Sequence, residues 1–383
     1  MVYLIWILVP LTVMLSAAVY LCRKAYKGVC FFAKKVSKRK QILIAAAVSA
    51  ILILPVIDID GLWFVVLMHL AVFLLVQDAV VLVVRKCFKQ KRFPFFAKAL
   101  YRSGIIAVLA AVAVVGYGCW NMRQIVKTEY TVEAGREIRE EGYTIVFFSD
   151  LHFGTTMDAE QLRRAAALIE SENPDIVILG GDIVDERTSL VQMKEAFAVM
   201  GDIRSRYGTF YVYGNHDKNE YSDHPAYTAA ELKDTIEQAG MRILEDEACE
   251  INGELVLIGR ADRGHDPDMR KTAAQLVESA DADKEWILID HQPVEYAEVM
   301  ESGYGLMLSG HTHAGQVWPL GMLAELFQTN ELTYGCRKEG DLTKVVTSGI
   351  AGWGYPVRTE KHSEYVVIHL INPLRDASAN SFG

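Results

Sequence analysis

The first 122 residues alternate long apolar runs with short basic segments. Four runs stand out, at about residues 2–22, 41–57, 62–84 and 103–120. The hydrocarbon core of a bilayer needs about 20 apolar residues in a helix. We therefore expect four transmembrane spans, of which the second is the shortest. A cleaved signal peptide carries its basic residues before the apolar run, whereas here they follow it, which favours a retained first helix.

The basic segments between these runs predict the orientation of the helices. Residues 23–40 contain eight Lys or Arg and residues 85–102 contain seven, whereas residues 58–61 contain none. Loops rich in Lys and Arg stay in the cytoplasm. We therefore expect a multi-pass cell membrane protein whose N-terminus and C-terminal part are both extracytoplasmic.

Two ionisable residues, Asp78 and His69, fall inside the third predicted span. Such residues often mark a functional path through a membrane protein. A transport relay needs more polar partners than these two, so we favour contacts within the helix bundle. The first 122 residues are then an anchor and not a transporter.

Beyond residue 122 the pattern changes to short apolar runs rich in Val, Ile and Tyr, which predict buried strands. They lie at residues 143–150, 175–182, 209–217, 255–260, 286–291, 305–313, 344–349 and 364–370. Amphipathic stretches at 158–172, with Asp158 as N-cap, and at 229–240 predict helices between them. We therefore expect a linker with an entering strand at 123–142, an α/β domain at 143–372 and a disordered tail at 373–383.

Charge divides the chain in the same place. The net charge is −9, but residues 1–122 hold 15 Lys and Arg against three Asp, which leaves −21 for the remainder. An acidic exported domain disfavours nucleic acid as a specific partner, and the basic loops suit anionic headgroups. The six cysteines form no CxxC pair, which argues against a zinc knuckle or a disulfide framework.

Polar residues gather where the predicted strands end. Taken singly, each would be a turn residue or a surface histidine, but five of the ten histidines occur in these positions beside Asp and Asn. Ligands of open α/β folds bind at strand ends, so these side chains can converge. Carboxylate, imidazole and amide oxygen without thiolate suit manganese, iron or zinc. The residues are Asp150, His152, Asp182, Asn215, His216, Asp217, His291, His311 and His313.

Five segments closely resemble the motifs of the calcineurin-like metallophosphoesterase superfamily. They are SDLHFG (149–154), GGDIVD (180–185), YGNHD (213–217), LIDHQP (288–293) and SGHTHAGQ (309–316), in the family's order. The segments GRADR (259–263) and GQVWP (315–319), after four spans, look like its membrane-anchored bacterial branch. The resemblance implies an α/β fold with a two-sheet β-sandwich flanked by helices.

The resemblance also implies a metal-dependent phosphoesterase in which a hydroxide bridging two divalent ions attacks a phosphate ester. The first ion would take Asp150, His152, Asp182 and His313, and the second Asp182, Asn215, His291 and His311, with Asp182 bridging. His216 would be the catalytic histidine and Asp217 would orient it. Arg260 and Arg263 are candidate phosphate contacts. The motifs specify neither the native metals, nor monoester against diester, nor an oligomeric state.

The apolar segment at residues 317–327 bears on the substrate. It is either a helix packed over the core or an apolar lip that dips into the membrane surface, and the lip would suit a lipid or lipid-linked phosphoester. Two other functions stay open. A non-catalytic metal-binding membrane receptor or scaffold would bind metal without turnover, and a transporter regulated by the soluble domain would need a polar path through the spans.

Overall fold

The computed structural model describes residues 2–54, 61–87, 93–264, 270–278 and 280–373, with only the backbone of residues 2–10. The chain divides into two compact units, Met1–Gly118 and Cys119–Gly383. Almost all of the tail predicted at 373–383 lies outside the described residues.

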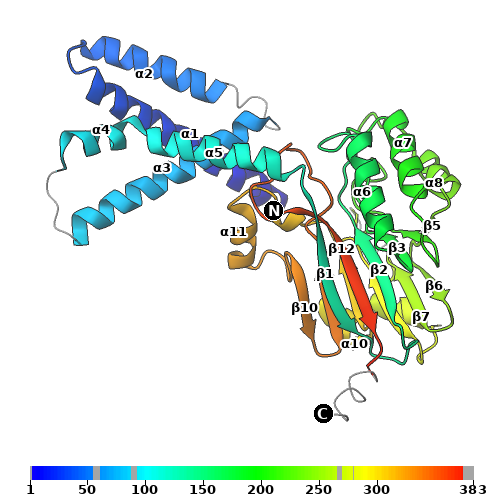
Figure 1. Cartoon of the computed structure of the whole chain (residues 1–383). Helices are drawn as coiled ribbons and strands as arrows, with labels where there is room; N and C mark the ends of the chain where they lie inside the picture. The colour runs from blue at the N-terminus through cyan, green and yellow to red at the C-terminus, as the bar shows by residue number, and fades with distance from the viewer. Residues whose placement is uncertain (1, 55–60, 88–92, 265–269, 279, 374–383) are drawn as a thin grey trace. The chain divides into compact units, whose positions relative to one another are not determined.

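The first unit is helical (Figure 1). Its helix α1 runs without a break past the predicted first span, so part of the first basic segment is helical. Gly104, with φ of 67°, ends α4, and the axes of α4 and α5 differ by 46°. The helices are α1 (Val2–Phe32), α2 (Lys38–Ile53), α3 (Leu62–Cys87), α4 (Phe95–Ser103) and α5 (Ile105–Asn121), which continues into the second unit.

In the part of the chain that the structure describes, fewer helices than predicted are long and apolar enough to span a bilayer. Among the described residues α3 is one such helix, and the bent pair α4–α5 is a second if it acts as one span. Helix α2 has only 16 residues, and the predicted span 41–57 ends outside the described residues. The four spans and their topology therefore stay a prediction.

The second unit contains two mixed six-stranded sheets (Figure 1). Sheet A has the order β1-β12-β2-β3-β4-β5, with β2 to β5 parallel, and sheet B has the order β10-β11-β9-β8-β7-β6. The strands of sheet A are β1 (Ile125–Glu133), β2 (Tyr143–Phe148), β3 (Ile176–Leu179), β4 (Thr209–Tyr211), β5 (Arg242–Ile243) and β12 (Ser363–Ile371). Those of sheet B are β6 (Glu247–Ile251), β7 (Leu255–Gly259), β8 (Glu285–Ile289), β9 (Leu306–Ser309), β10 (Gly335–Glu339) and β11 (Leu342–Val346).

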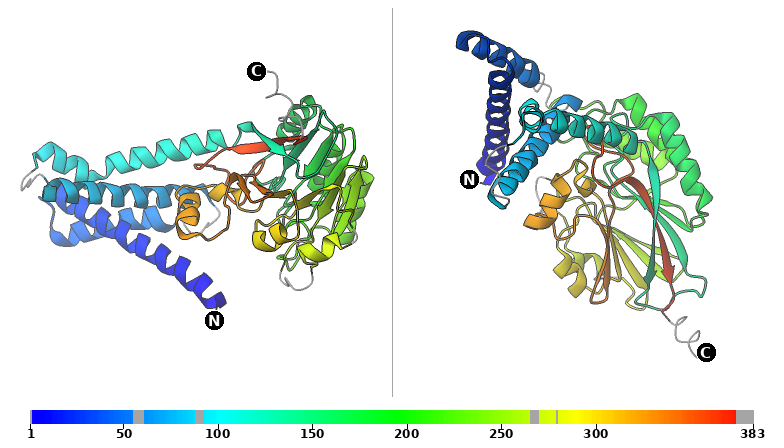
Figure 2. Two further views of the ribbon diagram at one scale, coloured as in Figure 1. Left: turned by 90° about the horizontal axis from the view of Figure 1, so that it is seen from below. Right: turned by 60° about the vertical axis from the view of Figure 1, so that its left-hand side comes forward.

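Alternate residues of each strand build three apolar layers. In β2, Ile145 and Phe147 enter the core shared by the two sheets, whereas Val146 and Phe148 pack under helices. Helices on opposite sides of the strands cover the outer faces (Figure 2). On sheet A they are α6 (Ala159–Ser171), α7 (Leu190–Gly201) and α8 (Ala229–Gln238), and on sheet B α9 (Ala273–Val277) and α10 (Tyr296–Glu301).

The predicted α/β sandwich is confirmed, and each of the eight predicted strand segments overlaps a strand. Asp158 caps α6 as predicted, through a hydrogen bond from the backbone of Gln161. The segment 123–142 contributes β1, which pairs with β12 along nine residues and so belongs to sheet A. The second unit begins shortly before residue 123 because Asn121 donates hydrogen bonds to the carbonyls of Arg358 and Lys361.

Candidate metal centre

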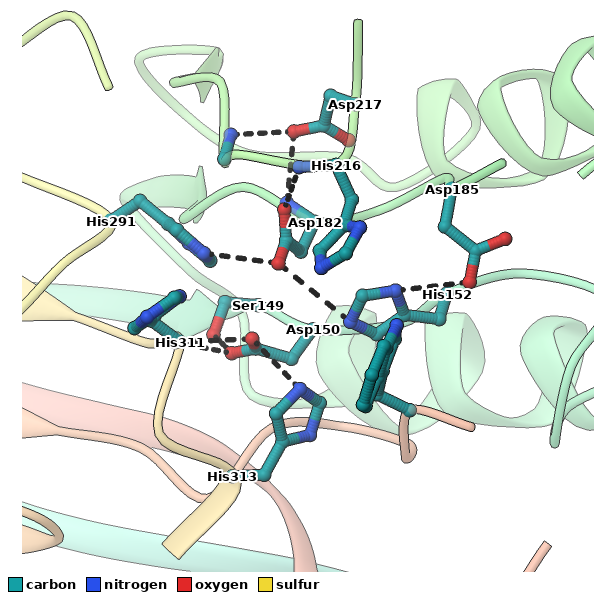
Figure 3. A network of polar contacts seen from close by, with 12 residues as sticks. Ser149, Asp150, His152, Asp182, Asp185, His216, Asp217, His291, His311 and His313 are labelled. Carbon is teal, nitrogen blue, oxygen red and sulfur yellow. Dashed lines mark hydrogen bonds and ion pairs between the residues drawn. The ribbon is translucent and has the colours of Figure 1, made fainter. Parts of the chain in front are cut away.

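The polar residues of the five motifs follow the carboxyl ends of five strands. Asp150 and His152 come after β2, Asp182 after β3, and His216 after β4. His291 comes after β8, and His311 and His313 follow β9 in sheet B. Because these strand ends meet at one edge of the sandwich, the side chains converge there (Figure 3).

Two groups of side chains lie close enough to hold a metal ion. The donor atoms of Asp150, His152 and His313 lie within 4.8 Å of one another, as do those of Asp182, His291 and His311. Within the first group, Asp150 Oδ1 lies 3.4 Å from His313 Nε2. The two groups contain six of the seven predicted metal ligands.

Asp182 lies between the two groups. Its Oδ2 is 3.1 Å from His291 Nε2 and 3.7 Å from His152 Nε2, so one oxygen faces a histidine of each group. Its Oδ1 accepts a hydrogen bond of 2.9 Å from the backbone N–H of His216. A carboxylate in this position can bridge two ions.

Hydrogen bonds at Nδ1 orient the buried histidines. His291 Nδ1 lies 2.7 Å from the carbonyl oxygen of Gly180, and His152 Nδ1 lies 3.2 Å from Asp185 Oδ2. Since a carbonyl and a carboxylate only accept, Nδ1 carries the proton in both rings. In the neutral ring each Nε2 then has its lone pair for a metal, which is the usual arrangement at metal-binding histidines.

Comparison with known proteins identifies this region. The family model for calcineurin-like phosphoesterases matches residues 143–315. The five motifs all lie in, or overlap, this matched region, which is similar to calcineurin-like phosphoesterases. An uncharacterized metallophosphoesterase of Helicobacter pylori is 32% identical over 235 residues, which cover 59% of this chain and 59% of that protein. A transmembrane protein with metallophosphoesterase domain from Danio rerio is 28% identical over 297 residues, which cover 72% of this chain and 64% of that protein.

The chain thus spans only part of the length of these relatives. Among solved structures, a dimetal phosphatase from Danio rerio has a TM-score of 0.41 and 11% identity, covering 60% of this chain and 93% of that chain.

Metallophosphoesterases use divalent metal ions, so the two groups of donor atoms are candidate ligand sets for this domain.

Several buried polar atoms at this centre have no hydrogen-bond partner. They are His152 Nε2, His291 Nε2, His313 Nδ1 and Asn215 Oδ1. All four belong to predicted ligands, and a buried polar atom without a partner is costly. Imidazole nitrogen and carbonyl oxygen are donors that zinc, manganese and iron accept, so the residues fit a pair of divalent ions.

Close backbone approach explains the glycines of the motifs. A Cβ on Gly214, in the YGNHD motif, would lie 2.2 Å from Asp182 Oδ1. A Cβ on Gly181 would lie 2.8 Å from His291 Nδ1. Larger residues at either position would displace a candidate ligand.

Asp217, which was predicted to orient His216, contacts backbone groups of the motif loops. Its carboxylate accepts backbone hydrogen bonds from Asp182, Ile183, Val184 and Gly214 and so holds two motif loops together. Burial and the charge of Asp182 raise the pKa of Asp217 to about 6. The ring of His216 has Glu186 as its partner, with Nδ1 3.0 Å from both carboxylate oxygens.

Charge around His216 favours its protonated form. Burial alone would lower the pKa of His216, but the hydrogen bond to Glu186 and the charge of Asp182 raise it above the ordinary value. The ring centroid lies 5.6 Å from that of Trp353 and 5.2 Å from that of Tyr221. His216 thus lies in an aromatic and acidic environment.

The two predicted phosphate contacts, Arg260 and Arg263, differ in their surroundings. Arg260 is buried, with Nη1 2.7 Å from Glu295 Oε2 and 3.5 Å from Asp290 Oδ2, and Arg270 pairs with the same two carboxylates. Arg260 therefore stabilises the segment that carries His291, and a phosphate contact would have to break these ion pairs. Arg263 is exposed.

Three supporting residues were not predicted from the sequence. Asp185 ends the GGDIVD motif, so its place in the motif could have indicated it, whereas the neighbouring Glu186 carries no such signal. Arg358 is fully buried and donates hydrogen bonds to the carbonyls of His313 and Ser348. Burial lowers its pKa to about 10.

Proposed function

We propose that the chain is a dinuclear metal-dependent phosphoesterase held at a membrane by its N-terminal helices. The observation that carries the proposal is the position of Asp182 Oδ2, between His291 of one donor group and His152 of the other. This arrangement supports two neighbouring ions that share one carboxylate.

The proposed first ion is held by Asp150, His152, Asp182 and His313, and the second by Asp182, Asn215, His291 and His311. Two bound divalent ions would lower the pKa of a coordinated water and offset charge on the phosphoryl oxygens. The acidic domain would repel phosphate at long range, so this local positive charge decides substrate binding.

His216 is the proposed general acid for the leaving oxygen. Glu186 accepts a hydrogen bond from Nδ1–H of His216, which leaves Nε2 as the ring atom that can transfer a proton to substrate. A well-placed general acid contributes about 10²- to 10⁴-fold. Glu186 keeps the imidazolium form available, since it raises the pKa of His216.

The proposed topology is four spans with an extracytoplasmic N-terminus and domain. Large apolar side chains on the outer faces of α1, α2, α3 and α5 support a lipid environment, among them Leu15, Ile51, Leu82 and Leu109, each at least 59% exposed. The relative from Danio rerio is named a transmembrane protein.

A lipid or lipid-linked phosphoester is the proposed substrate, because α11 (Leu320–Phe327) presents an apolar surface close in sequence to His313. Leu326 and Phe327 are 69% and 70% exposed, and the one buried residue of this helix is Gly321, which has no side chain. The backbone N–H groups of Gly321 and Met322 bind Glu360, which fixes the start of the helix. The exposure favours the membrane lip over a helix packed on the core.

The first test is hydrolysis by the full-length protein in neutral detergent with Mn²⁺, on matched phosphomonoesters and phosphodiesters. We expect turnover of at least one class and its loss in Asp182→Asn. Bound metal without turnover of any phosphoester would contradict the proposal and favour the receptor or scaffold. Full activity of Asp182→Asn would contradict the ligand assignment.

The second test concerns the lipid. Leu326→Ser with Phe327→Ser should lower kcat/KM for a phospholipid in mixed micelles about 30-fold, since each partly exposed side chain is worth about 1 kcal/mol of apolar burial. The same variant should keep its activity on a soluble phosphoester. Val191→Ser, which removes a side chain 75% exposed on α7, is the matched control. Equal losses of kcat/KM on the phospholipid and on the soluble phosphoester would contradict the proposed membrane lip.

A further inference from the structure

A pocket of about 490 Å³ lies between α1 and α3 in the first unit. Leu15 and Val19 form an apolar part of its wall, and Arg23 and Lys27 form a basic part. Asp78 is the residue that α3 contributes to the wall. The pocket therefore combines apolar and cationic surfaces in a unit with an apolar exterior.

The order of these residues along α1 gives the pocket a direction. Positions 15, 19, 23 and 27 are four apart and so follow one face of the helix. The face is apolar for its first turn and cationic for its last turn. At a rise of 1.5 Å per residue, the distance from Leu15 to Lys27 is about 18 Å. This length suits a headgroup together with the upper part of its acyl chains.

The carboxylate of Asp78 is already occupied. It pairs with Lys24 of α1 and accepts hydrogen bonds from the hydroxyls of Tyr20, at 2.9 Å, and of Tyr101, at 2.7 Å. The charges of Asp78 and Lys24 offset each other. Arg23 and Lys27 are exposed, and no acidic side chain in the described part of the chain pairs with either. The pocket thus keeps two positive charges, one on each of these residues.

We propose that this pocket binds an anionic phospholipid, with the phosphate at Arg23 and Lys27 and an acyl chain along Leu15 and Val19. The inference rests on the helical unit lying in a bilayer and is independent of the phosphoesterase activity. A zwitterionic lipid fits less well, because Lys24 already offsets the charge of Asp78, the acidic side chain that could attract an ammonium group. Cations near a membrane surface each contribute to binding of anionic lipid.

The test is a titration of the full-length protein in neutral detergent, with lipid binding counted by native mass spectrometry. The probes are phosphatidylglycerol, phosphatidylcholine and free glycerol phosphate. Phosphatidylglycerol should bind tightest. Arg23→Gln with Lys27→Gln should weaken its binding about 25-fold, which is about fivefold for each cation removed. Phosphatidylcholine binding should change less than twofold.

Arg39→Gln with Lys40→Gln is the matched control, since it removes one Arg and one Lys from the exposed start of α2, away from the pocket. Arg23→Lys keeps the charge and should keep binding, which separates a charge effect from misfolding. Equal binding of phosphatidylglycerol to the pocket and control variants would overturn the proposal. If glycerol phosphate displaces phosphatidylglycerol at an equal concentration, the pocket binds a free phosphate, and the proposal of a lipid site would be overturned.

Discussion

Asp185 offers the sharpest test of the proposed metal centre, because it contacts a proposed ligand without being one. Its Oδ2 lies 3.2 Å from His152 Nδ1, and its Oδ1 accepts the backbone N–H of Arg187 at 2.8 Å. In Asp185→Asn the amide oxygen would keep the bond from Arg187. The amide NH₂ would then face His152 Nδ1, and the ring would favour the tautomer with its proton on Nε2.

That tautomer cannot bind a metal through Nε2, so the expected loss is that of one buried hydrogen bond to a charged group. Such bonds contribute about 1.5–3 kcal/mol, which corresponds to about 10- to 150-fold. Removal of a supporting carboxylate at other metal sites lowers affinity about 10- to 100-fold. We therefore expect about 10- to 100-fold weaker binding of one ion.

The second ion should be spared, because the Nδ1 of His291 is held by the Gly180 carbonyl, which the substitution leaves in place. The assay is metal content by mass spectrometry after equilibration at a series of free Mn²⁺ concentrations. Asp185→Asn should lose one ion per chain at concentrations where the unchanged protein holds two. Asp158→Asn, at the exposed cap of α6, is the control. Equal loss of both ions, or of neither, would refute the reasoning.

Two other substitutions separate catalysis from stability. Glu186→Gln should lower kcat about 10- to 100-fold, within the range a general acid contributes, and should leave the metal content of the protein unchanged. A fall in metal content would instead make Glu186 part of the metal site. Arg260→Ala should lower the free energy of unfolding by about 2–3 kcal/mol. This loss is smaller than for a buried carboxylate left without any cation, because Arg270 still pairs with Asp290. KM for a soluble phosphoester should not change, and a rise of tenfold or more with normal stability would restore Arg260 as a phosphate contact.

The sequence could indicate the candidate ligands because each lies in the loop that follows a strand. Asp150, Asp182 and His291 come within three residues of the ends of β2, β3 and β8. Local pattern predicts where a strand ends, and the fold then places these ends together. Residues that support the ligands follow no such rule: Arg358 reaches the carbonyl of His313 from a loop 45 residues away.

The strands that the sequence pattern did not predict lack a continuous run of buried residues. Strand β10 is exposed along nearly its whole length at the edge of sheet B, and β5 has only two residues. The edge strand β6 has two exposed residues at its start. The apolar segment at 317–327 shows the converse case: Val317 is buried, but Leu326 and Phe327 are exposed on α11. Burial in these elements is decided by neighbours that pattern alone does not specify.

Backbone conformation at the proposed ligands leads to a last prediction. Asp150, His152, Asp182, His311 and His313 all have φ between 42° and 69°, which costs a non-glycine residue about 1 kcal/mol or more. Bound ions would offset this cost, so a chelator should lower the unfolding temperature of the domain. A ligand at 100 times its Kd stabilises by about 2.7 kcal/mol, or about 5–10 °C for a domain of this size. Asp182→Asn should unfold at the same temperature with and without chelator, and an equal shift in both proteins would place the metal effect outside this centre.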